Sequence, residues 1–223
     1  MADKIKEAYQ ASKNIYDDVL TQGNFFSRLY VKIFWSGTDD NEIARKVLSY
    51  IPDDFSGTIL DVPVGTAVFT ERKWKSLSSA RITCLDYSED MIGQARKRLG
   101  ERAYISCMQG DVGCLPMADA SFDLVLSMNG FHAFPDKEAA YRETVRALKP
   151  GGTFCGCFYT AGEYRRTDFM IRHVYEPANF FTPPYETMPG LKARLEKMYG
   201  TVALGHVKSI AWFVCRKRAA DER

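Results

Sequence analysis

Short apolar segments alternate with amphipathic segments along most of this chain, and this alternation is the feature that most constrains its fold. Between residues 58 and 158, runs rich in β-branched and aromatic residues are separated by stretches in which apolar side chains recur at helical spacing. This order is typical of strand–helix–strand units, which build a mostly parallel sheet covered by helices on both faces. We therefore predict an α/β fold of the doubly wound, Rossmann-like kind.

The strands can be placed from these runs. The five runs predicted to form the parallel part of the sheet are Thr58–Val62, Arg81–Asp86, Ala103–Met108, Phe122–Ser127 and Thr153–Phe158. Two later runs are predicted to form a closing hairpin, Val202–Val207 and Ile210–Cys215.

The connecting segments show helix and turn signals. A helix-like stretch runs from Phe69 to Leu77, and Ser88 is a good N-cap for a second helix with acidic residues in its first turn. Further helices are predicted from Asp136 to about Leu148 and around residues 191–198. The sequence Lys149–Gly152, which reads KPGG, predicts a turn between helix and strand.

Composition excludes several classes of protein. The net charge is only +2, from 30 Lys and Arg against 28 Asp and Glu, so we expect no nucleic-acid partner. No apolar run approaches the roughly 18 residues that cross a membrane, and no signal peptide is recognisable, so we expect no membrane insertion. Most of the six cysteines lie in apolar, strand-like runs, which fits a reducing cytoplasmic setting. The spacing of Cys155 and Cys157 favours packing over metal binding, and no metal is predicted.

Three aspartates recur at a constant interval. Asp61, Asp86 and Asp111 are 25 residues apart each time (86 − 61 and 111 − 86), and each comes at or just after the end of a predicted strand. In a doubly wound sheet the carboxyl ends of the strands form the ligand crevice. A turn or capping role explains any one of these residues, but a shared site explains the set better.

The first strand-to-helix turn indicates what kind of ligand that site takes. Residues 61–67 read DVPVGTA and contain one glycine, Gly65. A dinucleotide needs several glycines there, so that bare backbone can approach the diphosphate. Asp61 would also place negative charge beside the phosphates. The turn therefore favours a phosphate-free ligand with a cationic end.

S-adenosylmethionine has these properties. Its ammonium group is expected to meet Asp61, its ribose hydroxyls to donate to Asp86, and its adenine amino group to donate to Asp111. The apolar residues expected to enclose the adenine are Met91, Val112 and Leu115.

Four motifs in register resemble those of a known family. They are ILDVPVGTAVF, CLDYSEDMIGQAR, GDVGCLPMADASFDLVLS and ALKPGG, and together they span much of residues 40–158. In order and spacing they resemble the class I S-adenosylmethionine-dependent methyltransferases, and most closely the group (methyltransferase type 11) that includes ubiquinone/menaquinone-biosynthesis enzymes. The resemblance implies a seven-stranded sheet whose last strand is antiparallel.

The resemblance also implies roles for individual residues. Asp61 and Gly65 would lie in the methionine-binding loop, and Met128 and Asn129 near the methyl-bearing sulfur. Tyr16 would be a lid tyrosine over the cofactor. The cofactor-binding residues expected on this basis are Asp61, Val62, Pro63, Gly65, Thr66, Asp86, Tyr87, Met91, Gly110, Asp111, Val112, Met128, Asn129 and Tyr16.

The chain departs from the family pattern in the first loop. Pro63 and Ala67 stand where the family usually has glycines, which removes a backbone donor and narrows the space near the ligand. This departure keeps open a non-catalytic, methyltransferase-like binding or regulatory module. A nicotinamide-dependent oxidoreductase is a weaker alternative because the phosphate-tolerant glycines are missing, and a nucleic-acid methylase is weaker still.

The acceptor side is expected after the fourth strand. Residues 127–134 read SMNGFHAF, which is not the motif used by amine and nucleobase methylases, and His132 is the candidate general base. The aromatic-rich N-terminal helices and the insertion after the fifth strand favour a small apolar or aromatic acceptor under a lid. We expect a single domain over residues 1–223, as a monomer or homodimer. Its parts are a helical lid (1–50), a cofactor-binding core (51–158), an acceptor-side insertion with a helix (159–200) and the hairpin (201–216).

Overall fold

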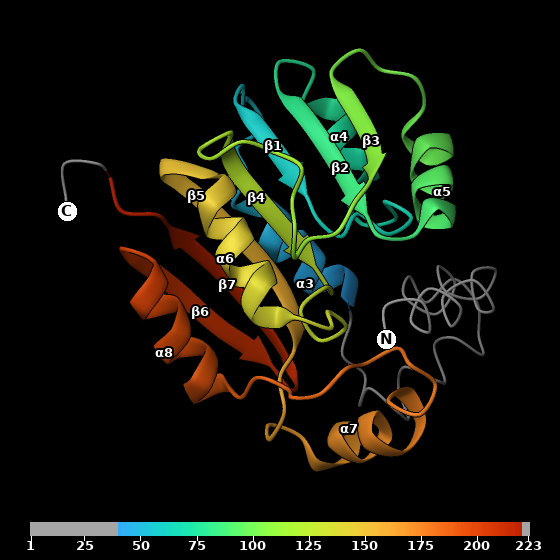
Figure 1. The fold of residues 1–223 in the computed structure, drawn as a ribbon, viewed down its shortest axis with the longest axis vertical. Helices are drawn as coiled ribbons and strands as arrows, with labels where there is room; N and C mark the ends of the chain where they lie inside the picture. Colours follow the sequence, from blue (N-terminus) through green and yellow to red (C-terminus); the bar gives the residue numbers. More distant parts are fainter. Residues whose placement is uncertain (1–39, 220–223) are drawn as a thin grey trace.

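The computed structural model describes residues 40–219, which contain seven strands in one sheet (Figure 1). The strand order across the sheet is β3-β2-β1-β4-β5-β7-β6. The strands are β1 (Thr58–Asp61), β2 (Arg81–Asp86), β3 (Ile105–Gln109), β4 (Phe122–Met128), β5 (Leu148–Tyr159), β6 (Thr201–Val207) and β7 (Ile210–Arg216).

Strand direction follows the sequence prediction. All neighbouring pairs from β3 to β5 are parallel, whereas β7 is antiparallel to both of its neighbours, β5 and β6. The strand order reverses between β1 and β4, since β2 and β3 extend to one side of β1 and β4 and β5 to the other. A crevice at the carboxyl ends of the strands is expected at this switch point. The predicted doubly wound sheet with an antiparallel last strand is confirmed.

Helices cover both faces of the sheet (Figure 1). Apolar side chains of α3, α4 and α5 share one buried cluster with β1 and β2, and those of α6 and α8 share a second cluster with β5 and β7. A further helix, α7, continues into a short π-helix in the insertion after β5. The helices are α3 (Asp40–Ser49), α4 (Glu71–Ser76), α5 (Glu89–Leu99), α6 (Lys137–Ala147), α7 (Arg165–Met170), the π-helix (Ile171–Tyr175) and α8 (Met188–Met198).

Local sequence explains where the two best-marked helices begin. The Ser88 hydroxyl accepts the Met91 N–H at the start of α5, and Asp136 accepts the Ala139 N–H at the start of α6. Both caps satisfy backbone donors that have no partner within the helix. The cap at Ser88 has a further consequence, because it fixes the turn between β2 and α5 at the carboxyl edge of the sheet.

Three predicted boundaries were wrong. The KPGG turn belongs to β5, because Leu148 pairs with Phe122 and Thr153 pairs with Leu124, so the residues between them bulge within the strand. Gly151 has a φ of 72°, and its N–H donates to the Lys217 carbonyl, so the bulge is held from outside the strand. The helix expected from Phe69 to Leu77 is limited to α4, and the third strand begins at Ile105.

The helical lid predicted for residues 1–50 is described only in part. Its last segment is helical as expected, because α3 begins at Asp40 and buries Ile43 and Val47 in the core. Tyr16 and the other N-terminal aromatic residues lie outside the described residues. Within residues 40–219, no helix has the length and apolar character that a membrane crossing needs.

Candidate cofactor and acceptor site

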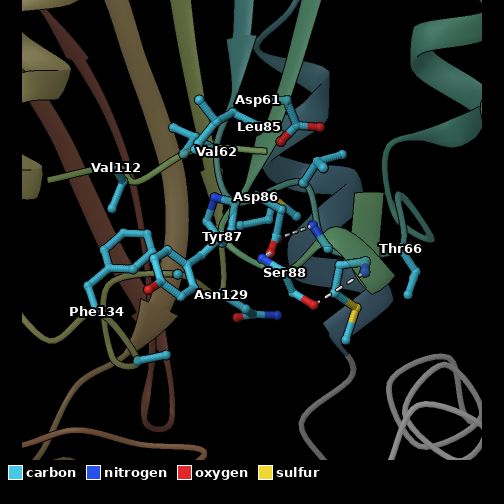
Figure 2. Close-up of a pocket in the computed structure, with 18 of the residues that line it drawn as sticks. Asp61, Val62, Thr66, Leu85, Asp86, Tyr87, Ser88, Val112, Asn129 and Phe134 are labelled. Atoms are coloured by element: carbon cyan, nitrogen blue, oxygen red, sulfur yellow. Dashed lines mark hydrogen bonds between the residues drawn. The ribbon is translucent and has the colours of Figure 1, made fainter. Parts of the chain in front are cut away.

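A cavity opens at the carboxyl ends of β1, β2 and β4, where the strand order reverses (Figure 2). Every cofactor residue predicted from the sequence lines this cavity, with the exception of Tyr16, which lies outside the described residues. Ten further residues line the cavity: Val64, Val68, Phe69, Thr70, Leu85, Ser88, Gly130, Ala133, Phe134 and Pro135. Of these, Gly130, Ala133 and Phe134 belong to the segment after the fourth strand that was expected on the acceptor side, and the capping role of Ser88 already fixed the turn after β2. The other six were not expected from the sequence.

Asp61 is the most buried carboxylate of the cavity. It ends β1 with 1% of its surface exposed, and the indole N–H of Trp74 donates to its Oδ2 over 2.7 Å. Its Oδ1 is buried and has no hydrogen-bond partner among the described residues. Burial raises the pKa of Asp61 to about 7, against the opposing effects of the Trp74 bond and of the nearby Thr70 hydroxyl. A buried acceptor without a donor costs free energy, so this oxygen favours a ligand that brings an N–H group.

Asp86 ties two loops together. Its Oδ2 accepts the Gly65 N–H and its Oδ1 accepts the Ser88 N–H, both over 2.9 Å, so it joins the turn after β1 to the start of α5 (Figure 2). Burial raises the pKa of Asp86 to about 6, although these N–H bonds favour the ionised form. Each carboxylate oxygen still has a second lone pair, which leaves room for hydroxyl donors from a ligand.

The third aspartate has a different environment. Asp111 is exposed, and its Oδ1 accepts the N–H of Gly113 over 2.7 Å. Beside it, Val112 is buried and presents an apolar surface to the cavity. Leu115 was expected to line the same wall, but it packs behind Val112 and does not reach the cavity. The three aspartates do converge on one cavity, although only two of them are buried.

The loop after β1 keeps its shape despite the missing glycines. Ala67 has a φ of 61°, in the left-handed region that glycine occupies most easily, and it is buried. Gly65 has a φ of 55°, which favours glycine, and the space that a Cβ would occupy there is free of described atoms to 4 Å. Gly130 is different, since a Cβ there would overlap Pro63 and the Phe134 ring. Close packing of Pro63 against Gly130 therefore joins the first loop to the loop after β4.

Apolar side chains wall the end of the cavity where the acceptor is predicted to bind, which we call the acceptor end. Ala133, Phe134 and Pro135 follow β4, and Phe69 comes from the loop before α4. Met128 and Asn129, which end and follow β4, also line the cavity. Asn129 has a φ of 53°, and its N–H donates to the Cys157 carbonyl over 2.7 Å. Asparagine tolerates this left-handed conformation better than most residues, and such positions often occur at functional sites.

Four residues hold the insertion against this apolar wall, and we call them the clasp: His132, Lys137, Phe181 and Thr182. The Thr182 N–H donates to the His132 carbonyl over 2.9 Å, and the Thr182 hydroxyl donates to the Ala133 carbonyl over 3.0 Å. The buried Lys137 ammonium donates to the carbonyls of Thr182 and Phe134. Burial lowers the pKa of Lys137 to about 8.

His132 lies within the clasp, outside the lining of the cavity. Its ring stacks on Phe181 with 4.1 Å between the ring centres, and its Nδ1 accepts the Tyr159 N–H over 3.4 Å. Burial, with a smaller effect of the Lys137 charge, lowers the pKa of His132 to about 3. The imidazole is therefore neutral at physiological pH. Its predicted role as general base stays a prediction.

These contacts limit which other ligands fit. The Gly65 N–H, which a diphosphate would need, already donates to Asp86, and two buried carboxylates stand beside it. Both facts disfavour a dinucleotide. Within residues 40–219, His, Cys, Asp and Glu do not gather in a group of three that suits a metal ion.

Comparison with known proteins agrees with this geometry. Residues 60–156, which carry β1 to β5 and most of the cavity, match a family described as "Methyltransferase domain". This match, with the relatives below, supports a class I S-adenosylmethionine-dependent methyltransferase. S-adenosylmethionine is accordingly its cofactor, and the buried Oδ1 of Asp61 fits the ammonium end of that molecule.

Relatives of this methyltransferase include quinone-modifying enzymes. It is 29% identical to the ubiquinone/menaquinone biosynthesis C-methyltransferase UbiE of Geotalea daltonii, over 77% of this chain and 71% of the relative. It is 37% identical to the demethylmenaquinone methyltransferase of Desulfitobacterium hafniense, over 43% of this chain and only 39% of the relative. These similarities support membership of the ubiquinone/menaquinone-biosynthesis-like group.

Among solved structures, the fold is similar to a methyltransferase of Thermotoga maritima described as a possible histamine N-methyltransferase. The TM-score is 0.68, the alignment covers 96% of this chain and all of the other, and the identity is 16%. At this identity the likeness concerns the fold alone. The likeness in fold covers most of this chain and not only residues 60–156.

Proposed function

We propose that this methyltransferase transfers the methyl group in line to a small apolar or aromatic acceptor bound beside Asn129. In this arrangement Asp61 binds the methionine ammonium, Asp86 accepts from the ribose hydroxyls, and Met91 and Val112 enclose the adenine. When bound, S-adenosylmethionine supplies a methyl group that its sulfonium has already activated. The task left to the chain is to align the acceptor with that group and to exclude water.

The observation that carries this proposal is the buried Oδ1 of Asp61, which makes no hydrogen bond of ordinary geometry within residues 40–219, although the Thr70 hydroxyl lies near enough to lower the pKa of Asp61. Trp74 fixes the carboxylate from one side and leaves the other oxygen for a ligand. An ammonium donor would supply that hydrogen bond and favour the ionised form of Asp61, which burial alone disfavours.

The acceptor end supports the choice of substrate class. The carboxylates that line the cavity are Asp61, Asp86 and Asp111, and all three are assigned to the cofactor end. The described residues at the other end, which include Phe69, Phe134 and Pro135, offer an apolar surface instead. Such a wall suits an aromatic or aliphatic acceptor whose nucleophilic atom needs little help to lose a proton.

The protonation state of His132 leads to a testable prediction about the pH dependence of activity. Because the pKa of its buried imidazole is about 3, it is expected to remain neutral throughout the pH range of activity. We therefore expect kcat to show no transition with a midpoint near pH 6.5 that disappears in His132→Gln. Such a transition would assign the general-base role to His132.

The proposal is tested by binding and then by transfer. Calorimetric titration with S-adenosylhomocysteine should show binding well below the millimolar range, and NADH should show none. Transfer of labelled methyl groups from S-adenosylmethionine is then measured on quinols, simple phenols, small aliphatic amines and duplex DNA. We expect label on quinols or phenols only. Binding without transfer to any acceptor would favour a non-catalytic module, and transfer to DNA or amines alone would overturn the proposed acceptor class.

A further inference from the structure

The loop of residues 110–121 connects β3 to β4 and forms the adenine side of the cavity with Asp111 and Val112. Its other side rests on α6, where the Cβ of Ala139 lies 3.4 Å from the position that a Cβ on Gly113 would take. The end of the loop is held by backbone bonds, because Ala120 and Ser121 donate to the carbonyls of Arg146 and Ala147. The middle of the loop depends on side chains of α6.

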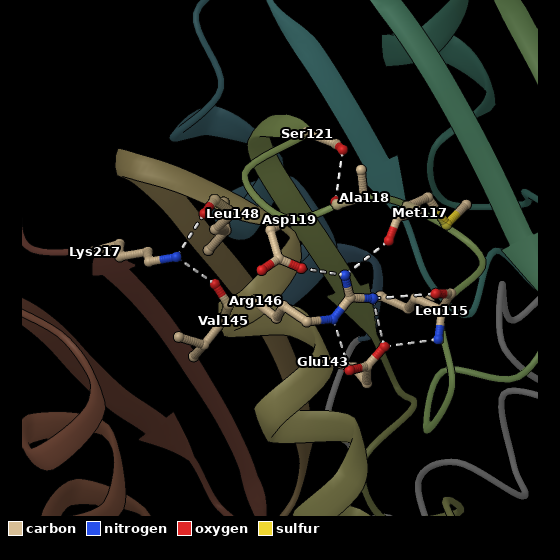
Figure 3. Close-up of polar contacts among 10 residues, drawn as sticks. All are labelled: Leu115, Met117, Ala118, Asp119, Ser121, Glu143, Val145, Arg146, Leu148 and Lys217. Carbon is tan, nitrogen blue, oxygen red and sulfur yellow. Dashed lines mark hydrogen bonds and ion pairs between the residues drawn. The ribbon is translucent and has the colours of Figure 1, made fainter.

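Arg146, in the last turn of α6, holds the middle of the loop (Figure 3). Its Nη1 donates to the Met117 carbonyl over 2.8 Å and to Asp119 Oδ1 over 2.7 Å. Its Nη2 donates to the Leu115 carbonyl over 3.1 Å. The remaining contacts, from Nη2 and Nε, go to the two oxygens of Glu143. The five N–H groups of a guanidinium are thereby matched by five acceptors, three of them in the loop.

Glu143, one turn earlier on α6, holds the same loop, and we call the bonds of Arg146 and Glu143 to it the brace. Its Oε2 accepts the Leu115 N–H over 2.8 Å, so the N–H and the carbonyl of Leu115 are both held by side chains of this helix (Figure 3). Leu115 packs in the same buried cluster as Val112, three residues earlier in the loop. A shift of the Leu115 backbone would therefore move the apolar surface that Val112 presents to the cavity.

We propose that Arg146 and Glu143 are positioning residues for the nucleobase: they lie outside the cavity and set the loop position at which Asp111 and Val112 distinguish adenine from other bases. This inference rests on the proposed placement of adenine at that loop. Charge-assisted bonds to backbone carbonyls are well suited to the task, because they fix a loop more firmly than apolar contacts alone.

The inference is tested by comparing two ligands that differ only at the base. S-inosylhomocysteine carries a carbonyl where S-adenosylhomocysteine carries the adenine amino group, so it has an acceptor in place of a donor. The wild type should bind S-adenosylhomocysteine more tightly than the inosine analogue. In Arg146→Met, affinity for S-adenosylhomocysteine should fall roughly tenfold, the size of one charge-assisted hydrogen bond, and the ratio of the two dissociation constants should approach one.

Lys217 supplies a matched control. Its ammonium donates to the carbonyls of Val145 and Leu148 at the same end of α6, and both of these bonds go to the end of the helix rather than to the loop (Figure 3). Lys217→Met should therefore leave the ratio of dissociation constants at the wild-type value. Glu143→Gln keeps the side-chain volume and should lower the ratio less than Arg146→Met does; it also replaces that variant if Arg146→Met does not fold.

The outcomes separate this inference from the proposed function. If the wild type fails to bind S-adenosylhomocysteine, the placement of the cofactor itself is wrong. If the wild type discriminates between the two ligands and the Arg146 and Glu143 variants discriminate equally well, the cofactor placement stands and the positioning role is overturned. An equal loss of affinity for both ligands in Arg146→Met would also overturn the positioning role, because that result would indicate a general loss of structure.

Discussion

The two ends of the cavity are built in different ways. At the cofactor end, Asp61 and Asp86 end adjacent parallel strands, and their partners Gly65, Trp74 and Ser88 lie in the turns after these strands or in the first helix between them. At the acceptor end, the wall after β4 is held by the clasp, in which Thr182 bonds to Ala133 from 49 residues away.

The two ends of the cavity therefore depend on different parts of the molecule. Sheet topology alone brings the carboxylates together, so the cofactor end is fixed by the part of the fold that this family shares. The acceptor end depends on how the insertion docks, which a few side chains determine. A change at one end should therefore have little effect on the other, and the following predictions test that separation.

The largest effect is expected at Asp86. In Asp86→Ala, the N–H groups of Gly65 and Ser88 lose their acceptor and the ribose loses its partner, so affinity for S-adenosylhomocysteine should fall by roughly 100-fold, measured by calorimetry. Glu89→Gln, at an exposed acidic residue in the next helical turn, serves as the control and should bind as the wild type does. Retention of wild-type affinity in Asp86→Ala would show that the cofactor end is not organised by this carboxylate.

The second prediction concerns pH. The pKa of Asp61 in the folded chain, about 7, lies above its ordinary value of 3.8, so the folded state holds a proton that the unfolded state releases. Its contribution to stability is therefore present at low pH and is lost as pH rises from about 4 to 7. Over this window the wild type without ligand should lose stability relative to Asp61→Asn, as measured by urea unfolding at each pH.

Ligand binding should reverse this trend. An ammonium group at Asp61 favours the carboxylate, so binding of S-adenosylhomocysteine at pH 6 should release protons, and affinity should increase as pH rises toward 7. Calorimetry in two buffers with different ionisation enthalpies measures the proton release. Asp86, with a raised pKa of about 6, contributes in the same direction, so Asp61→Asn should reduce the release without abolishing it. Binding with no proton release in either protein would contradict the assignment.

A smaller effect is expected at the clasp. Thr182→Val removes the hydroxyl that bonds to the Ala133 carbonyl and should lower the free energy of unfolding by about 1 kcal/mol. Affinity for S-adenosylhomocysteine should change by no more than about a factor of two, because the bonds of Thr182 go to the acceptor end. For an acceptor found in the transfer assay, KM should rise while the dissociation constant of the cofactor product stays the same. A large loss of cofactor affinity would show that the two ends are coupled.

The smallest effect is expected at Ala67. Glycine relieves the left-handed backbone there but loses a buried methyl group and gains freedom in the unfolded chain, so Ala67→Gly should change stability by less than about 1 kcal/mol in either direction. Cofactor affinity should stay close to that of the wild type. A marked gain in affinity would show instead that alanine at this position weakens the cofactor end.

Much of the cofactor end was predictable from the sequence, for an identifiable reason. The 25-residue spacing of Asp61, Asp86 and Asp111 marks the ends of successive strands, and these strands are parallel neighbours in the sheet, so their carboxyl ends lie close together. The cap at Ser88 was equally visible because the donor and acceptor are three residues apart. The sequence did not show which of these carboxylates are buried, since Asp111 is exposed although it has the same spacing as Asp61 and Asp86.

Local pattern, then, determined most elements of this chain, the closing hairpin and the cofactor residues that line the cavity. Only the tertiary structure decided which carboxylates are buried, that Trp74 fixes Asp61, and that His132 packs under Phe181 outside the cavity. It also decided the braces from Arg146 and Lys137, since each joins residues that are distant in sequence. Spacing along the chain indicates contacts within an element or between neighbouring strand ends. Burial, and the pKa shifts that follow from it, depend instead on every element packed around a residue.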